Sequence, residues 1–158
     1  MPGRDVEFGA GATVITARPE LDEPLRGTGQ AWTTAEASRS LSLSLIAAFD
    51  HEAFALGGAL RVNLLRRADA ALGVEAELGW AWLALSLPVA ARVFDQTWVY
   101  SAPRAGNFGA NLLLSLPLGA SARIVDGFML RPEAQLSAQS LELVGPRVHF
   151  GAAAAYQD

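Results

Sequence analysis

The sequence predicts an all-β fold: a closed, antiparallel, up-and-down transmembrane β-barrel formed by residues 1–158 as a single domain. Three observations predict it. Apolar residues alternate with small or polar residues along most of the chain, which is typical of strands. The composition is 51% hydrophobic and only 18% charged, which is apolar for a soluble domain. The residues between the large apolar ones are mainly Gly, Ala and Ser, which suit the crowded interior of a small barrel.

The alternation divides into eight predicted strands, each with its large apolar residues on one parity. They span residues 6–14, 40–49, 54–64, 72–82, 85–93, 107–118, 128–139 and 147–156. Eight is the favoured number, and ten is the alternative if residues 97–101 form a further strand. Because lipid accepts a β-sheet only when every backbone amide is paired, the barrel is expected to be closed.

Two of the predicted connections are long, Arg18–Ala37 and Asp95–Gly106, whereas others are tight. Asp126-Gly127 is a dipeptide favoured in hairpins. Long loops at one end and short turns at the other are typical of outer-membrane barrels. Since aromatic residues in surface loops are frequent binding positions, we expect the loop residues Trp32, Trp98 and Tyr100 to be contact candidates for a partner.

The large apolar residues are expected to face lipid, and the aromatic ones among them to form a belt at the short-turn end. The predicted interface aromatics are Phe8, Phe49, Phe54, Trp80, Trp82, Phe128 and Tyr156. Membrane barrels carry such belts where they meet water. The alternative is a soluble, lipocalin-like barrel, in which the same apolar face would line an internal ligand site.

Charged residues occupy the opposite parity and are expected to face the lumen. The predicted lumen network comprises Arg61, Glu75, Glu77, Arg92, Arg131, Glu133, Arg147 and His149. Unpaired charges in a narrow lumen cost several kcal/mol each, so these groups are expected to pair and to fill the interior rather than leave an open pore. If the barrel were soluble, they would instead be solvated charges on its surface.

The last strand carries the most specific motif. Its outward parity, Val148, Phe150, Ala152, Ala154 and Tyr156, resembles the terminal strand of small, eight-stranded outer-membrane β-barrel proteins of Gram-negative bacteria. In that family the terminal strand is recognised by the barrel assembly machinery and usually stops at the aromatic residue, whereas here residues 157–158 follow. The Leu-Ser-Leu-Pro stretches at residues 85–88 and 114–117 are similar to strands of such barrels. The resemblance implies an outer-membrane location, contact with its lipid and a signal peptide removed before this chain begins.

The sequence shows no enzymatic motif. There is no cysteine, no metal-ligand spacing and no recognisable serine beside His149, which is expected to be a hydrogen-bonded filler of the lumen. A net charge of −4 gives no footprint for nucleic acid. We therefore expect no catalysis, cofactor or metal, and a structural or partner-docking role through extracellular loops, with other envelope proteins as partners. The alternatives are a lipid A-modifying enzyme, which would need His149, and a narrow channel.

Overall fold

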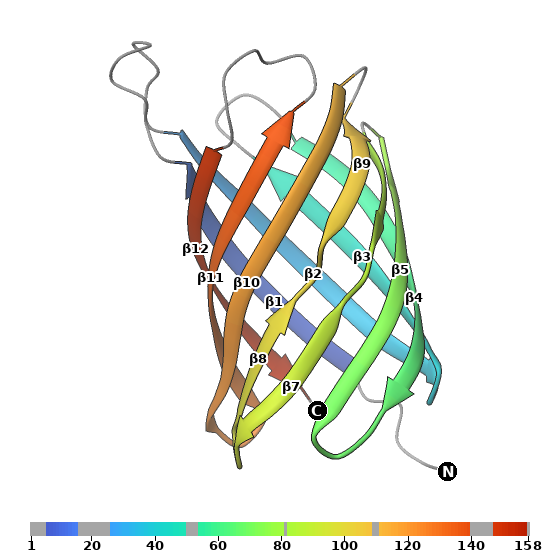
Figure 1. The fold of residues 1–158 in the computed structure, drawn as a ribbon, viewed down its shortest axis with the longest axis vertical. Coiled ribbons are helices and arrows are strands. Elements are labelled where there is room, and N and C mark those ends of the chain that lie inside the picture. Colours follow the sequence, from blue (N-terminus) through green and yellow to red (C-terminus); the bar gives the residue numbers. More distant parts are fainter. Residues whose placement is uncertain are drawn as a thin grey trace.

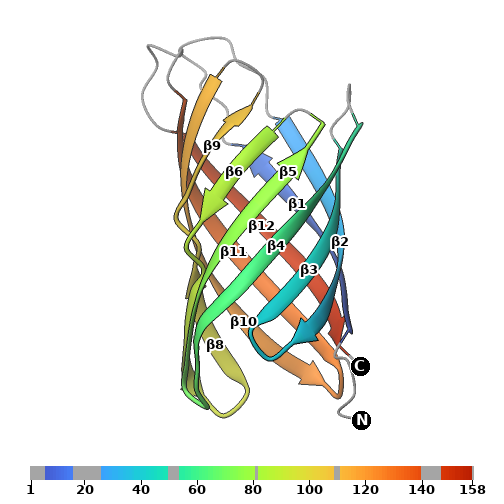
Figure 2. The same cartoon turned by 90° about the vertical axis from the view of Figure 1, so that its right-hand side faces the viewer.

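The computed structural model describes residues 6–15, 26–49, 54–80, 82–108, 111–139 and 147–157. Within them one antiparallel sheet closes on itself, because β12 pairs with β1 and β10 pairs with β11. Figures 1 and 2 show a barrel of tilted strands with both termini at the same end. The strands are β1 (Val6–Ile15), β2 (Arg26–Ser38), β3 (Leu41–Phe49), β4 (Phe54–Arg66), β5 (Ala70–Gly79), β6 (Trp82–Ser86), β7 (Val89–Phe94), β8 (Thr97–Ser101), β9 (Arg104–Phe108), β10 (Asn111–Val125), β11 (Phe128–Gln139) and β12 (Arg147–Gln157).

The wall of the barrel consists of ten antiparallel strands, because two of them are each interrupted once. β6 and β7 both pair with β5, and β8 and β9 both pair with β10. The pairing of β6 with β9 continues into that of β7 with β8 without a change of register. Eight strands are therefore wrong, and the alternative of ten is confirmed.

The two missing strands had been predicted as the long loops. β2 has the outward residues Ala31, Thr33 and Ala35 where other strands have leucine or phenylalanine. It therefore lacks the alternating large apolar residues by which the other strands were recognised. It is nevertheless a strand, because β1 and β3 pair with it on both sides, and such pairing outweighs intrinsic preference. β8 lies within the other predicted loop, and β9 begins there and ends two residues beyond it, in the segment predicted as the strand 107–118. Residues 18–25 of the first predicted loop lie outside the described residues.

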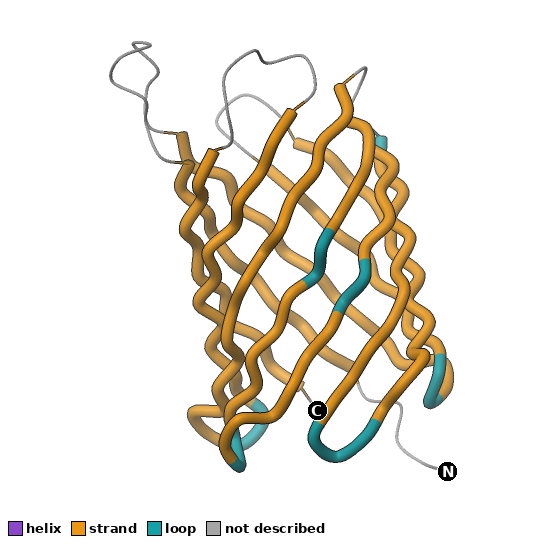
Figure 3. Tube along the Cα trace, in the orientation of Figure 1, coloured by secondary structure: helices purple, strands orange, loops and turns teal. Residues whose placement is uncertain are grey.

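Three prolines lie at one level of the wall, in neighbouring strands. Pro88 separates β6 from β7, Pro103 separates β8 from β9, and Pro117 lies within β10 beside the second break. Figure 3 shows the two breaks side by side. The carbonyls of Pro88 and Pro103 accept bonds from Gly73 N (2.8 Å) and Leu87 N (3.0 Å). Because proline has no N–H, the reciprocal ladder bonds cannot form.

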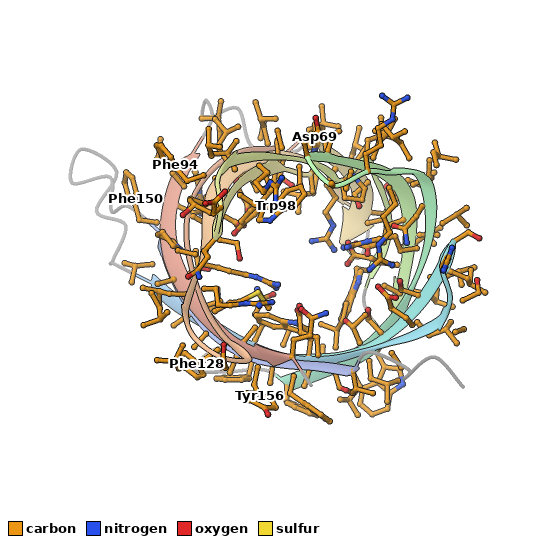
Figure 4. The ribbon with its side chains drawn as sticks, turned by 90° about the horizontal axis from the view of Figure 1, so that it is seen from below. Asp69, Phe94, Trp98, Phe128, Phe150 and Tyr156 are labelled. Carbon is orange, nitrogen blue, oxygen red and sulfur yellow. The ribbon has the colours of Figure 1, made fainter. Side chains whose placement is uncertain are left out.

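Large apolar side chains point outward around the whole wall and remain exposed. Leu118, at the middle of β10, is 58% exposed. The buried apolar residues within the described part of the chain are few: Ala59, Trp82, Ala84 and Ala155. In β12, Phe150 and Tyr156 point outward (Figure 4), and the alternate residues face inward, as predicted. The described residues therefore contain no apolar core like that on which a soluble barrel depends.

The outward aromatic residues divide between the two ends. Phe8, Phe128 and Tyr156 are adjacent in the sheet at the end that carries the termini, but Phe49, Phe54 and Trp80 lie at the opposite end. A single belt at the short-turn end is therefore wrong. Overlooking β2 caused the error, because one missing strand reverses the direction assigned to the four strands that follow it, which are β3, β4, β5 and the interrupted strand of β6 and β7.

Trp82 is a second correction to that belt. It was predicted to face lipid, but its residue is only 7% exposed and its indole lies against Gly57 and Gly79. β6 begins at Trp82, so the tight turn precedes this residue rather than following it. The parity therefore changes before Trp82, which places its side chain inside the barrel.

Candidate functional site

The lumen is the place where polar side chains converge, and its first group lies on β4, β5, β6 and β9. Arg61 and Glu75 are opposite each other in register, and Arg61 Nε donates to Glu75 Oε2 at 2.8 Å. Ser86 Oγ donates to Glu75 Oε1 at 3.5 Å, and Arg104 Nη2 donates to Glu77 Oε2 at 2.7 Å. Because residues two apart in a strand share a face, both glutamates point inward, and each is matched by an arginine.

The second group joins β1, β2 and β11. Arg131 Nη1 and Nη2 donate to the two carboxylate oxygens of Glu7 at 2.8 and 2.7 Å. Trp32 Nε1 donates to Glu7 Oε1 at 3.0 Å. β12 lies between β1 and β11, and its inward residue Ala155 is only 1% exposed. The small side chains of β12 therefore leave room for a bidentate ion pair across it, which is the strongest geometry for such a pair.

Tyr100, on β8, forms a third contact with β11. Its hydroxyl donates to Glu133 Oε2 at 3.1 Å. The ring lies over Gly119 of β10, where a Cβ would be 2.4 Å from the ring carbon that bears the hydroxyl. At the end of the barrel that carries the termini, Arg66 and Glu36 form a more exposed ion pair at 2.7 Å.

The structure brings six of the eight predicted network residues into contacts with inward-facing partners. These are Arg61, Glu75, Glu77, Arg131, Glu133 and His149. Arg92 is exposed near the end of β7, and within the described residues it enters no ion pair; its backbone N donates to Asp69 O at 2.8 Å. Arg147 lies opposite Ser137 in the ladder.

The partners of Glu77 and Arg131 were missed from the sequence. Arg104 lies in the segment predicted as the loop Asp95–Gly106. Because side chains alternate between two faces only in a strand, the sequence did not indicate that Arg104 faces the lumen. Glu7 stands between the outward residues Val6 and Phe8 of a predicted strand, and this inward parity was the signal that could have identified it.

The serine beside His149 was also missed. Ser137 and His149 share a hydrogen bond between Oγ and Nε2, because the register of β11 and β12 places them diagonally across the ladder. The expectation of no neighbouring serine is therefore wrong. A nucleophile–base pair of this kind works with a third group that orients the histidine, and within the described residues no carboxylate bonds to His149.

The three predicted loop aromatics lie in strands and face the lumen, so their assignment to extracellular contact loops is wrong. Trp32 is in β2 and Tyr100 in β8, and both are bonded to glutamates as described above. Trp98, also in β8, points into the barrel when it is viewed from the end that carries the termini (Figure 4). These three side chains face the lumen because β2 and β8 pair with their neighbouring strands, and the sequence did not reveal this pairing.

Glycines in neighbouring strands make room for the inward indoles. A Cβ on Gly9 would lie 2.2 Å from Trp32 Cζ2, and a Cβ on Gly79 would lie 2.5 Å from the Trp82 ring. Real Cβ atoms do not approach so closely, so each indole occupies the space that a side chain would fill. The glycine of one strand and the aromatic residue of the next therefore form a single packing unit.

Replacing Gly9 with alanine is expected to lower the free energy of unfolding by about 1–2 kcal/mol. The added methyl group displaces Trp32 and weakens its hydrogen bond to Glu7. Denaturant unfolding of the barrel in lipid vesicles measures the change. Gly27→Ala is the matched control, because its nearest neighbouring atom would be 3.9 Å away. Equal losses in both variants would contradict the packing unit.

The described part of the chain lacks two kinds of feature, a membrane-spanning helix and a cluster of metal-binding side chains. None of its segments forms a helix of the length and apolarity needed to span a membrane. No group of three or more His, Asp or Glu side chains comes together there as a possible metal site. The chemistry of the lumen is that of ion pairs, hydroxyls and indoles.

No protein-family model matches the sequence, and no curated protein matches it. Among solved structures, the barrel is similar to "KdgM porin in complex with disordered oligogalacturonate", with a TM-score of 0.52, 6% identity, and coverage of 96% of this chain and 98% of that one. A second structure, "KdgM porin", gives a TM-score of 0.50, 8% identity, and coverage of 95% and 98%. At such identities the likeness concerns the fold alone. The chain thus shares with these porins the closed antiparallel fold of transmembrane β-barrels, here with ten strands.

Proposed function

We propose that this chain is an integral β-barrel protein of a Gram-negative outer membrane. The observation that supports it best is the outward face, on which large apolar side chains stay exposed around a sheet without a free edge. Exposed apolar surface of this extent is rare on soluble monomers. A closed barrel satisfies its own backbone amides, which is the condition for a β-sheet to contact hydrocarbon.

The orientation follows from the connections. The turns at residues 39–40, 67–69, 95–96 and 126–127 are short and lie at the end that carries the termini (Figure 1). Short turns are typical of the periplasmic end of such barrels. Gly127 has a φ of 76°, a conformation that favours glycine and permits the tight hairpin between β10 and β11. We place this end in the periplasm.

The proposed role is structural or partner-docking rather than that of a wide pore. Inward-facing Trp32, Trp82 and Tyr100 take up lumen space, and two arginine–glutamate groups bridge neighbouring parts of the wall. The surrounding partner is outer-membrane lipid, and the assembly machinery acts on β12 during biogenesis. Other envelope proteins would dock at the end opposite the termini, where β1 and β11 end and β2 and β12 begin.

The membrane assignment is tested by solubility and gel migration. The purified protein should need detergent to stay monodisperse, and an unheated sample should migrate differently from a boiled one, because the closed barrel resists unfolding in the loading buffer. A monodisperse monomer without detergent would contradict the proposal and favour a soluble ligand-binding barrel.

The absence of a wide pore is tested separately in planar lipid bilayers. The filled lumen is expected to give either no conductance steps or steps far smaller than those of a trimeric porin measured in the same salt. Large, steady steps from the purified barrel would overturn the structural role and establish a channel. A heat-denatured sample is the control for leakage caused by detergent.

A further inference from the structure

We propose that the lumen mouth beside the termini is a binding site for a small zwitterionic ligand, of the kind represented by a free amino acid. A cavity of about 220 Å³ lies there. Its rim includes Asp95, Gln96 and Arg123, and its floor includes Trp98, Ser121 and Met129. The site goes beyond the proposed membrane role and does not depend on it, because the cavity belongs to the barrel itself.

Backbone pairing fixes the geometry of this cavity. Trp98 and Ser121 are opposite each other in the ladder between β8 and β10. Arg123 N donates to Gln96 O at 3.0 Å, which ties the turn after β7 to the end of β10. Figure 4 shows Trp98 directed inward at this end of the barrel. The rim groups are therefore held by neighbouring strands rather than by a long loop.

Charge defines the class of ligand. Asp95 and Arg123 line the same cavity, and within the described part of the chain neither of them enters an ion pair. A carboxylate and an indole together suit an ammonium group, which binds to the face of an aromatic ring. A guanidinium suits a carboxylate, which it can hold with two hydrogen bonds. A ligand that carries both charges matches both rim groups at once.

The three floor residues of the cavity carry no charge themselves. Arg131 Nε donates to Ser121 Oγ at 3.4 Å, and its Nη2 contacts Met129 Sδ at 3.9 Å. The charge of Arg131 is already matched by Glu7. The thioether of Met129 is a soft, apolar contact surface. An amino acid would thus place its carboxylate at Arg123, its ammonium group between Asp95 and the Trp98 ring, and an apolar side chain towards Met129, which makes leucine a suitable probe.

The test follows the indole Nε1–H signals of the ¹⁵N-labelled barrel in a non-ionic detergent, whose headgroup cannot compete as a zwitterion. Leucine should shift the Trp98 signal saturably, and Trp98→Phe identifies that signal. Leucinamide keeps only the positive charge, and N-acetylleucine keeps only the negative one. Each is expected to bind about ten-fold more weakly than leucine, because each loses one charge-assisted hydrogen-bonding group.

Variants assign the two charges. Asp95→Asn should weaken leucine binding about ten-fold and leave N-acetylleucine unchanged, whereas Arg123→Gln should weaken leucine and leave leucinamide unchanged. Arg67→Gln, an exposed arginine in the turn after β4, is the matched control and should change nothing. Equal affinity for the three ligands, tighter binding of N-acetylleucine than of leucine, or no saturable shift of Trp98 would each overturn the proposal. Heat-dependent gel migration of every variant shows that it has folded.

Discussion

Glu7→Ala is expected to destabilise the barrel by about 2–4 kcal/mol, because it leaves the Arg131 guanidinium in the lumen without its counter-charge. The two side chains are only 19% and 24% exposed and are joined by two hydrogen bonds. Removing one member of such a pair costs more than the pair contributes, since the remaining charge stays partly desolvated. Reversible denaturant unfolding from lipid vesicles measures the loss.

The exposed pair at the end that carries the termini is the matched control for Glu7. Arg66 is 47% exposed in its pair with Glu36, so Glu36→Ala should cost at most about 0.5 kcal/mol. Adding Arg131→Met to Glu7→Ala should recover part of the stability, because no unmatched charge then remains. Equal losses for Glu7→Ala and Glu36→Ala, or no recovery in the double variant, would show that the bidentate pair does not stabilise the wall.

Leu118→Arg should lower the free energy of unfolding from lipid by about 2–4 kcal/mol. Leu118 lies at the middle of β10 and points outward with 58% of its surface exposed. In a bilayer this position lies in hydrocarbon, where a guanidinium loses its hydration. In water the same substitution on an exposed residue would change stability little. The size of the loss in the free energy of unfolding therefore indicates whether lipid or water surrounds the wall.

Val125→Arg provides the depth control on the same strand. Val125 is also outward and exposed, but it is the last residue of β10, at the end that carries the termini. An arginine there reaches the headgroup region and should cost about 0–1 kcal/mol. If both substitutions cost equally little, the apolar face does not lie in lipid.

Alternation identified strands only where the outward residues are large. β3, with Leu43 and Leu45, and β12, with Phe150 and Tyr156, could be predicted because their two faces differ strongly in side-chain size. β2 could not, since its outward face carries only glycine, alanine and threonine, and its one large apolar residue, Trp32, faces inward. A strand of that composition is fixed by its neighbours, and a pattern within the segment does not contain this information.

In the candidate site, too, some features could be predicted from the sequence and others could not. The inward direction of Glu75 and Glu77 follows from their spacing and was predictable. Their partners were not, because partner identity depends on closure and register. Glu7 and Arg131 are 124 residues apart and meet only because β12 lies between β1 and β11. Trp32 in β2 and Trp98 in β8 face the lumen for the same reason. The pairing of their strands with neighbouring strands sets the direction of these side chains, and a short stretch of sequence does not contain this information.

The row formed by Pro88, Pro103 and Pro117 gives the barrel an uneven elasticity. Deforming a closed sheet stretches the hydrogen bonds between its strands, so a wall yields first where the fewest bonds resist. β11 and β12 pair without interruption from Phe128 to Ser137 and form the stiff side. The side built from β6 to β9 is the compliant one. When the wall is deformed, the cross-section is expected to flatten along that side, and the side of the lumen that contains Glu7 and Arg131 is expected to keep its shape.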